Sequence, residues 1–171
     1  MPYSELLRST VFLAAGAATA LAAVSVIGIQ RAGADGLIVT VAVVWWIAAA
    51  VIGTVSGSAG RVAEGVRRTL AEARTVGPGG PGVSLPAPGR IALARLWPIL
   101  VAVVIAGGLG IFLPEVAVIG SGYALLVALA WRNRESAVLA IEGRDGVRFL
   151  VESGSALRPV KLIRSPGFTT L

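Results

Sequence analysis

Catalytic chemistry in this sequence would depend on acidic residues near its C-terminal end, the candidates for a pair of cooperating carboxylates. General acid–base catalysis needs an acid and a base that are held close together. Asp145 precedes Gly146 in a turn-like segment, and the glutamates alternate with basic residues, which is typical of solvated charge. We therefore expect no catalytic role for the acidic residues of this region, which are Glu135, Glu142, Asp145 and Glu152.

The residue types that most metal and nucleophile chemistry needs are missing from the sequence. The 171 residues include no Cys and no His. Disulfides, thiolate nucleophiles, Cys/His metal sites and haem ligation by His are therefore excluded. The glycine-rich segments 77–82 and 107–110 lack the Lys-Ser/Thr pair of a phosphate-binding loop. We expect neither a metal nor a cofactor, and we predict that the protein is not an enzyme.

The apolar residues lie in long blocks, which is the pattern of helices in a lipid bilayer. They make up 56% of the chain, and the mean hydropathy is +0.83. A soluble domain has about 45–50% apolar residues and disperses them at amphipathic spacing. At about 1.5 Å of rise per residue, uncharged runs of this kind can cross a hydrocarbon core of about 30 Å. The predicted spans are residues 9–30, 36–60, 96–114 and 116–131.

Pro114 and Glu115 interrupt the apolar stretch over residues 96–131. A proline disrupts a helix interior and a carboxylate avoids hydrocarbon, so both favour a tight turn at a membrane surface. The four runs therefore pair as two helical hairpins. One long re-entrant feature over 96–131 is an alternative, as is cleavage of the first run as a signal peptide near residues 32–34.

The positions of the basic residues predict the orientation. Every Lys and Arg except Arg31 lies before the first run, between the second and third, or after the fourth. Cytoplasmic segments of membrane proteins carry such an excess. We expect a multi-pass protein with cytoplasmic N- and C-termini. The net charge of +6 is then a topology signal, and no nucleic-acid partner is expected.

The basic segment between the hairpins predicts a short amphipathic helix followed by a linker. Within residues 61–75, Val62, Val66, Leu70 and Ala73 recur at helical spacing. Proline and glycine dominate residues 77–89, which is typical of a linker. The helix is expected either to extend the second span or to lie on the inner leaflet. On the leaflet, its basic residues would lie near anionic headgroups; these are Arg61, Arg67, Arg68 and Arg74.

The tail, residues 135–171, predicts a short cytoplasmic β-hairpin. Segments 138–142 and 147–152 are rich in β-formers and flank an Asp-Gly turn, and 159–164 can add a third strand. About 35 residues are too few to form an independent core. We therefore predict that one apolar face docks on the membrane, the cytoplasmic helix, another copy or a partner. The docking residues are Val138, Val147, Phe149 and Val151.

Small residues recur along the predicted spans. Gly53 and Gly57 form a GxxxG motif, and Ala14, Ala18 and Ala22 repeat every four residues. Small faces let helix backbones approach closely in lipid. We expect these residues to pack helices within the chain or between copies in a homo-oligomer.

Together these patterns predict an all-α integral membrane protein of four transmembrane helices, arranged as two hairpins, with a short cytoplasmic β-hairpin tail. The expected divisions are 1–60 (first transmembrane hairpin), 61–94 (amphipathic helix and Pro/Gly linker), 95–134 (second transmembrane hairpin) and 135–171 (β-rich tail).

The leading functional hypothesis is a non-enzymatic bacterial inner-membrane protein that acts as scaffold, anchor or regulatory subunit of an unidentified membrane or cytoplasmic protein. The arginine bias is typical of a GC-rich genome. No predicted span contains Asp, Glu, Lys, Arg or His, which argues against an ion-coupled pump. The alternative is a small oligomeric transporter or channel subunit, suggested by the glycine-rich third run and by Ser25, Thr40, Thr54, Ser56 and Ser121. A lipid-modifying enzyme is favoured only by the basic inner surface.

Overall fold

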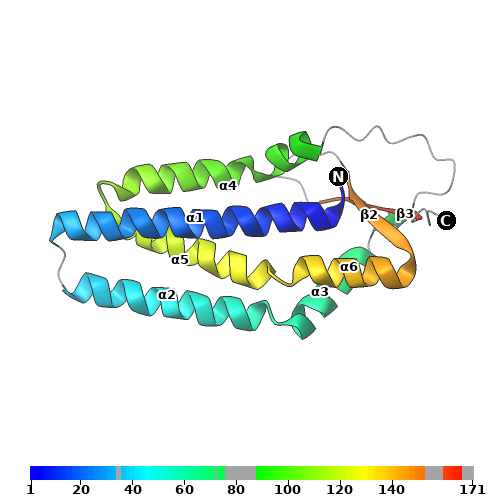
Figure 1. Cartoon of the computed structure of the whole chain (residues 1–171), viewed down its shortest axis with the longest axis horizontal. Helices are drawn as coiled ribbons and strands as arrows, with labels where there is room; N and C mark the ends of the chain where they lie inside the picture. The colour runs from blue at the N-terminus through cyan, green and yellow to red at the C-terminus, as the bar shows by residue number, and fades with distance from the viewer. Residues whose placement is uncertain (34–35, 72, 76–87, 153–159, 167–171) are drawn as a thin grey trace. The chain divides into compact units, whose positions relative to one another are not determined.

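The computed structural model describes residues 1–33, 36–71, 73–75, 88–152 and 160–166, and these are mostly helical (Figure 1). The described elements, in chain order, are α1 (Tyr3–Ala32), α2 (Gly36–Ser56), α3 (Ala59–Ala71), β1 (Arg74–Thr75), α4 (Pro88–Gly110), α5 (Pro114–Trp131), α6 (Arg134–Asp145), β2 (Val147–Val151) and β3 (Leu162–Pro166).

The chain forms two compact units, and each is described by itself. The sheet unit consists of Met1–Ser9, Ala59–Trp97 and Asn133–Leu171. The bundle unit consists of Thr10–Ser58 and Pro98–Arg132. Each unit therefore combines segments that are far apart in the sequence.

Four helical stretches are long and apolar enough to cross a membrane, as the sequence predicts. They are Tyr3–Arg31, Gly36–Ser56, Gly89–Gly110 and Pro114–Asp145. Two of them begin earlier than their uncharged runs, because Glu5 and Arg8 lie within α1 and Arg90 and Arg95 lie within α4. The predicted Pro/Gly linker falls mainly on residues 76–87, outside the described residues.

The break between α4 and α5 follows from proline and carboxylate chemistry. α4 ends at Gly110, and Pro114 is the first residue of α5. A proline at that position loses no hydrogen bond, because the first N–H groups of a helix have no partner within it. Glu115 lies in the first turn, where its charge complements the helix dipole. Residues 96–131 are therefore two helices with a break where the sequence predicts a turn.

Large apolar side chains are exposed along the bundle unit. Val44 on α2, Val104 on α4 and Phe112 before α5 are among them, and Phe112 is 82% exposed. A soluble protein rarely leaves contiguous apolar surface of this extent in water. In a lipid bilayer, apolar side chains on the surface carry no free-energy cost of exposure to water. The exposed surface is therefore consistent with four spanning helices.

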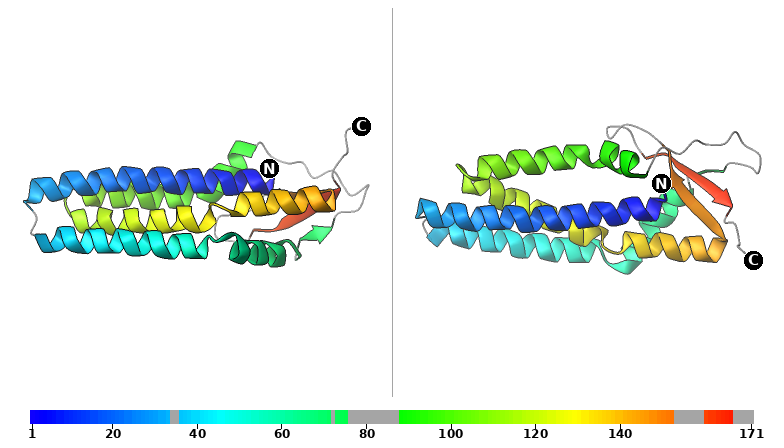
Figure 2. Two further views of the ribbon diagram at one scale, coloured as in Figure 1. Left: turned by 60° about the horizontal axis from the view of Figure 1, so that its bottom comes forward. Right: turned by 45° about the horizontal axis from the view of Figure 1, so that its top comes forward.

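The sheet unit contains a small mixed sheet in the order β1-β3-β2. β2 pairs antiparallel with β3, and β1 pairs parallel with β3 (Figure 2). The start of the chain adds to β2 as well: the Met1 carbonyl accepts a 2.9 Å hydrogen bond from the Val151 N–H, and Pro2 forms a bridge with Leu150. Segments from the start, middle and end of the chain thus share one sheet.

The tail contains an antiparallel strand pair, as predicted, but the predicted pairing of 138–142 with 147–152 is wrong. Val138 and its neighbours belong to α6, and the antiparallel partner of β2 is β3. Alanine, leucine, glutamate and arginine in α6 are strong helix formers. Gly146, with φ of 62°, ends the helix in the left-handed conformation, and its N–H donates to the Glu142 carbonyl. The Asp-Gly pair therefore terminates a helix.

The predicted helix over 61–75 extends too far at its C-terminal end. α3 stops at Ala71, and Arg74 and Thr75 form β1. Their backbone pairs with Ile163 and Arg164 of β3, far away in the sequence. Such tertiary pairing overrides a local helical pattern. Arg74 is thus not on the helical face with the other arginines.

Candidate functional site

The GxxxG motif lies where α2 meets α5, the most closely packed helix pair of the bundle unit (Figure 1). A Cβ added at Gly53 would lie 2.9 Å from the Leu126 carbonyl oxygen, and one at Gly57 would overlap the Leu129 carbonyl oxygen. Both glycines are buried. The two backbones approach closely because no side chain separates them.

Two tryptophans of α2 also contact α5. The Trp46 Nε1–H donates a 2.9 Å hydrogen bond to the Ser121 hydroxyl, and Ser121 donates to the Val118 carbonyl at 2.9 Å. The Trp45 ring lies on Gly122, where a Cβ would overlap the indole. An indole N–H in an apolar surrounding needs such a partner. Both tryptophans therefore pack on α5.

The three alanines of α1 have different surroundings. Ala14 is buried, whereas Ala18 and Ala22 are half-buried and line a cavity of about 350 Å³. The other lining residues are Thr19, Trp46, Ser121 and Leu125. The Thr19 hydroxyl donates to the Ala15 carbonyl at 3.0 Å, so both hydroxyls in the wall are already engaged within their own helices. The cavity is therefore mainly apolar.

Other polar side chains of the spans are bonded within their own helices. Ser25 donates to the Leu21 carbonyl at 2.7 Å, Thr40 to Gly36 at 2.8 Å and Thr54 to Ala50 at 2.9 Å. Such bonds satisfy hydroxyls in lipid without a second helix. These three residues therefore support a polar transport pathway through the protein less than their positions in the sequence suggested.

The predicted docking residues of the tail lie in the interior of the protein. Val138 and Val151 are 0% exposed, Phe149 is 2% exposed and Val147 is half-buried. The Phe149 N–H donates a 2.8 Å hydrogen bond to the Glu142 carboxylate, which ties β2 to α6. α6 in turn packs against α3. The apolar face of the tail is thus covered within this chain.

The apolar face of α3 is covered too. Val62, Val66 and Leu70 are each 6% exposed, and α3 packs on α6. The predicted amphipathic pattern is present over these residues, but its apolar side faces protein. Only the polar side is left for solvent or headgroups.

The sequence pattern did not lead us to expect residues 1–7 in the core of the sheet unit. Met1, Tyr3, Leu6 and Leu7 are buried, and Leu7 is among the most enclosed side chains. The spacing of Tyr3, Leu6 and Leu7 is i, i+3, i+4, the spacing of one helix face. That pattern before Arg8 could have indicated a buried helix start.

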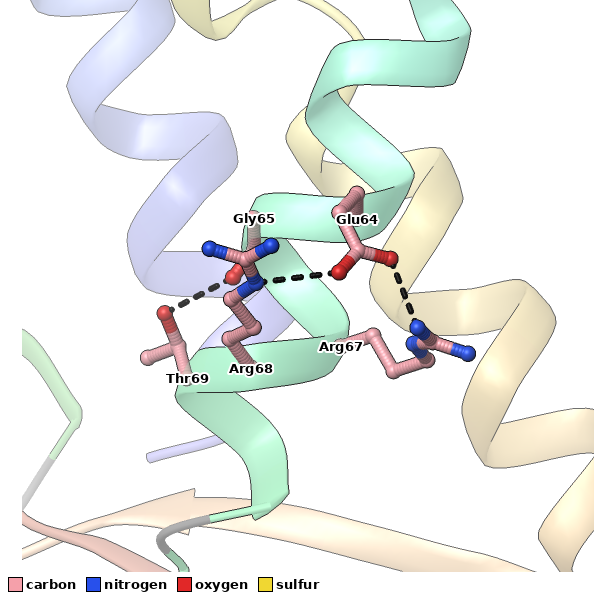
Figure 3. Close-up of polar contacts among 5 residues, drawn as sticks. All are labelled: Glu64, Gly65, Arg67, Arg68 and Thr69. Carbon is pink, nitrogen blue, oxygen red and sulfur yellow. Dashed lines mark hydrogen bonds and ion pairs between the residues drawn. The ribbon is translucent and has the colours of Figure 1, made fainter.

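The exposed side of α3 carries a three-residue ion cluster (Figure 3). The Glu64 carboxylate accepts from Arg67 at 2.8 Å and from Arg68 at 2.9 Å. The hydrogen bond from Arg68, together with the charge of Arg67, holds the pKa of Glu64 below its usual range. Arg61 is exposed on the same helix. Within the helix, the Thr69 hydroxyl donates to the Gly65 carbonyl at 3.1 Å (Figure 3).

Two of the four acidic residues considered for catalysis have structural partners in the tail. Glu142 accepts from the Phe149 N–H, and Asp145 accepts from Arg144 at 2.8 Å. Within the part of the chain that the structure describes, no three His, Cys, Asp or Glu residues are grouped so that they could hold a metal ion.

No known protein family, no curated protein and no solved structure matches this chain.

Proposed function

We propose that the protein is a non-enzymatic, multi-pass protein of the bacterial inner membrane that holds the sheet unit at the cytoplasmic surface as a scaffold, anchor or regulatory subunit for a partner protein. Both termini are cytoplasmic in this proposal. The orientation is supported by the basic residues, which, Arg31 apart, lie outside the apolar runs on the proposed cytoplasmic side.

The observation that carries the proposal is the construction of the sheet unit. Its core combines Leu7 from the start of the chain, Val138 from α6 and Val151 from β2, each less than 2% exposed. A folded unit, unlike separate loops, presents a fixed surface. Glu142 and Asp145 are engaged in structural contacts, which favours binding over catalysis as the activity of this surface.

Affinity purification in mild detergent tests the proposal, with two matched phenylalanine variants. Phe149→Ala removes a side chain that is 2% exposed from the sheet unit, whereas Phe112→Ala removes one that is 82% exposed. We expect a protein that co-purifies in stoichiometric amounts with the wild type and Phe112→Ala but not with Phe149→Ala. No such protein, or equal recovery with both variants, would contradict the scaffold proposal.

The proposed orientation has its own test, since the chain contains no Cys. A single cysteine at Phe112, in the break between α4 and α5, should react with an impermeant thiol reagent on intact spheroplasts. One at Leu139, exposed on α6, should react only after permeabilisation. The opposite labelling pattern would reverse the topology.

A second candidate, a small oligomeric transporter or channel subunit, is favoured by the cavity between α1, α2 and α5. Its apolar wall with the Trp46–Ser121 hydrogen bond suits a small, weakly polar solute. Proteoliposome flux measurements test it, with Ser121→Ala against Ser25→Ala, whose hydroxyl does not line the cavity. Flux that only Ser121→Ala alters would support a transporter, and equal effects of both variants, or no flux, would remove this candidate.

A further inference from the structure

We propose that the exposed arginines of α3 bind the phosphate groups of anionic lipids at the cytoplasmic membrane surface, and that Glu64 competes with these lipids as an internal counter-ion. The inference rests on the proposed membrane insertion. It adds the class of lipid that the protein binds and a carboxylate, Glu64, that limits this binding.

The charge arrangement gives the first argument. Arg67 and Arg68 have side chains that are 69% and 78% exposed, and both reach back to Glu64 one turn earlier. Arginine presents a planar fork of donors that matches phosphate as well as carboxylate. A lipid phosphate can therefore replace the Glu64 carboxylate on either guanidinium without a change in the backbone.

The burial of the apolar face gives the second argument. Val62, Val66 and Leu70 lie within the protein, so α3 cannot insert these side chains among acyl chains without leaving its place on α6. An interfacial amphipathic helix uses its apolar face for such insertion. Contact between α3 and lipid is therefore electrostatic and takes place at the level of the headgroups.

The chain limits how far the arginines can lie from the end of α2. α2 ends at Ser56 and α3 begins at Ala59, so Arg61 lies five residues beyond the end of the span. Five residues reach at most about 17 Å even when fully extended. Arg67 and Arg68 follow six and seven residues later, about 9–11 Å along α3. The potential of anionic lipids decays over a Debye length of about 8–10 Å, so the proposal requires α3 to lie nearer to the bilayer than this upper limit.

Glu64 sets the strength of this attraction. Together with Arg67 and Arg68 it leaves the cluster with one net positive charge, where two unpaired arginines would carry two. A lipid phosphate must displace the carboxylate or share the arginines with it. Removal of the Glu64 charge should therefore strengthen lipid binding, which a merely structural ion pair would not do.

The test uses the full-length protein in bilayers of phosphatidylcholine with phosphatidylglycerol. A donor fluorophore on a single cysteine at Ala63, exposed on α3, transfers energy to acyl-labelled phosphatidylglycerol or acyl-labelled phosphatidylcholine. We expect phosphatidylglycerol to be enriched roughly two- to five-fold near the wild type. Arg67→Gln with Arg68→Gln should bring the ratio close to one, and Glu64→Gln should raise it above the wild-type value.

Controls with equal charge change are available in the same unit. Arg148→Gln with Lys161→Gln removes two exposed positive charges, and Glu152→Gln removes one exposed negative charge. The proposal is supported if these controls leave the ratio unchanged. It is overturned if they alter it as much as the α3 variants do, or if Glu64→Gln has no effect.

Two further outcomes have defined meanings. If inorganic phosphate lowers the enrichment more than chloride does at equal ionic strength, the arginines recognise the phosphate group itself, which supports the proposal. Equal loss with both salts overturns it, because only the net charge of the lipid surface then matters. If the protein does not withstand alkaline extraction from the vesicles, the proposed function fails as well. Stable insertion without enrichment overturns only this inference.

Discussion

The two units bury opposite kinds of residue. In the bundle unit the closest contact is made by Gly53 and Gly57, while large side chains such as Val104 point outward. In the sheet unit the interior holds Phe149 and Val138, while charged side chains point outward, among them Arg67, Arg68 and Arg148. The difference is the one expected if the bundle unit lies in lipid and the sheet unit in water, since water drives large apolar groups inward and lipid does not. Helices in lipid then pack through close contact between their backbones. A core in water packs through the volume of its side chains.

This comparison predicts opposite responses to side-chain size, and the largest effect belongs to the sheet unit. Phe149→Ala should cost about 3–5 kcal/mol of unfolding free energy in that unit, because it empties a site that is 2% exposed. Faster amide exchange in β2 measures the loss. Phe112→Ala should be nearly neutral, and equal effects of the two changes would remove the distinction between the units.

In the bundle unit, enlargement is the damaging change. Gly53→Leu and Gly57→Leu should each cost about 1–3 kcal/mol or more, because the new side chain meets the α5 backbone. Thermal unfolding in detergent measures this cost. Gly16→Leu is the matched control, since nothing lies within 4 Å of a Cβ at that glycine. An unchanged melting temperature for both GxxxG variants would show that the motif reflects only composition.

A smaller effect is expected at the polar contact between α2 and α5. Ser121→Ala deprives the Trp46 indole N–H of its acceptor and should cost about 1 kcal/mol. A double-mutant cycle with Trp46→Phe isolates this bond, and a coupling energy of zero would show that the hydrogen bond does not stabilise the pair. Ser25→Ala, whose hydroxyl bonds within α1, should show no coupling to Trp46→Phe.

The smallest effect is a pH dependence at the exposed cluster of α3. Because the arginines lower the pKa of Glu64, its contribution to helix stability is complete above the unfolded-state pKa of about 4.3 and disappears as the pH falls through the lower folded-state value. Amide exchange in α3 should therefore differ between wild type and Glu64→Gln at neutral pH and converge in strong acid. A difference that persists in strong acid would assign the effect to another group.

The sequence predicts most of what depends on local pattern and little of what depends on distant pairing. The four apolar helices, the break at Pro114 and the buried face of Val62, Val66 and Leu70 follow from composition and periodicity. The GxxxG motif indicates that α2 has a close neighbour but does not identify α5, because glycines carry no information about their partner.

The tail shows why the pairing of distant segments could not be predicted from the sequence. An Asp-Gly pair fits both a hairpin turn and the end of a helix. Here the helix formers before Asp145 favour the helix end. The pairing of Arg74 with Ile163 joins segments with no shared local signal. We expected Phe149 and Val138 to be buried on two paired strands. Phe149 is buried on a strand, but Val138 is buried on the helix α6 of the same unit.

The hydrogen bond between Met1 and Val151 joins two segments that are synthesised at different times. About 150 residues separate the two segments, so their synthesis is roughly 8–30 s apart at ordinary elongation rates. Every apolar helix is made in that interval. The native surroundings of Tyr3, Leu6 and Leu7 are therefore complete only after β2 has been made, and the sheet unit can close only at that stage.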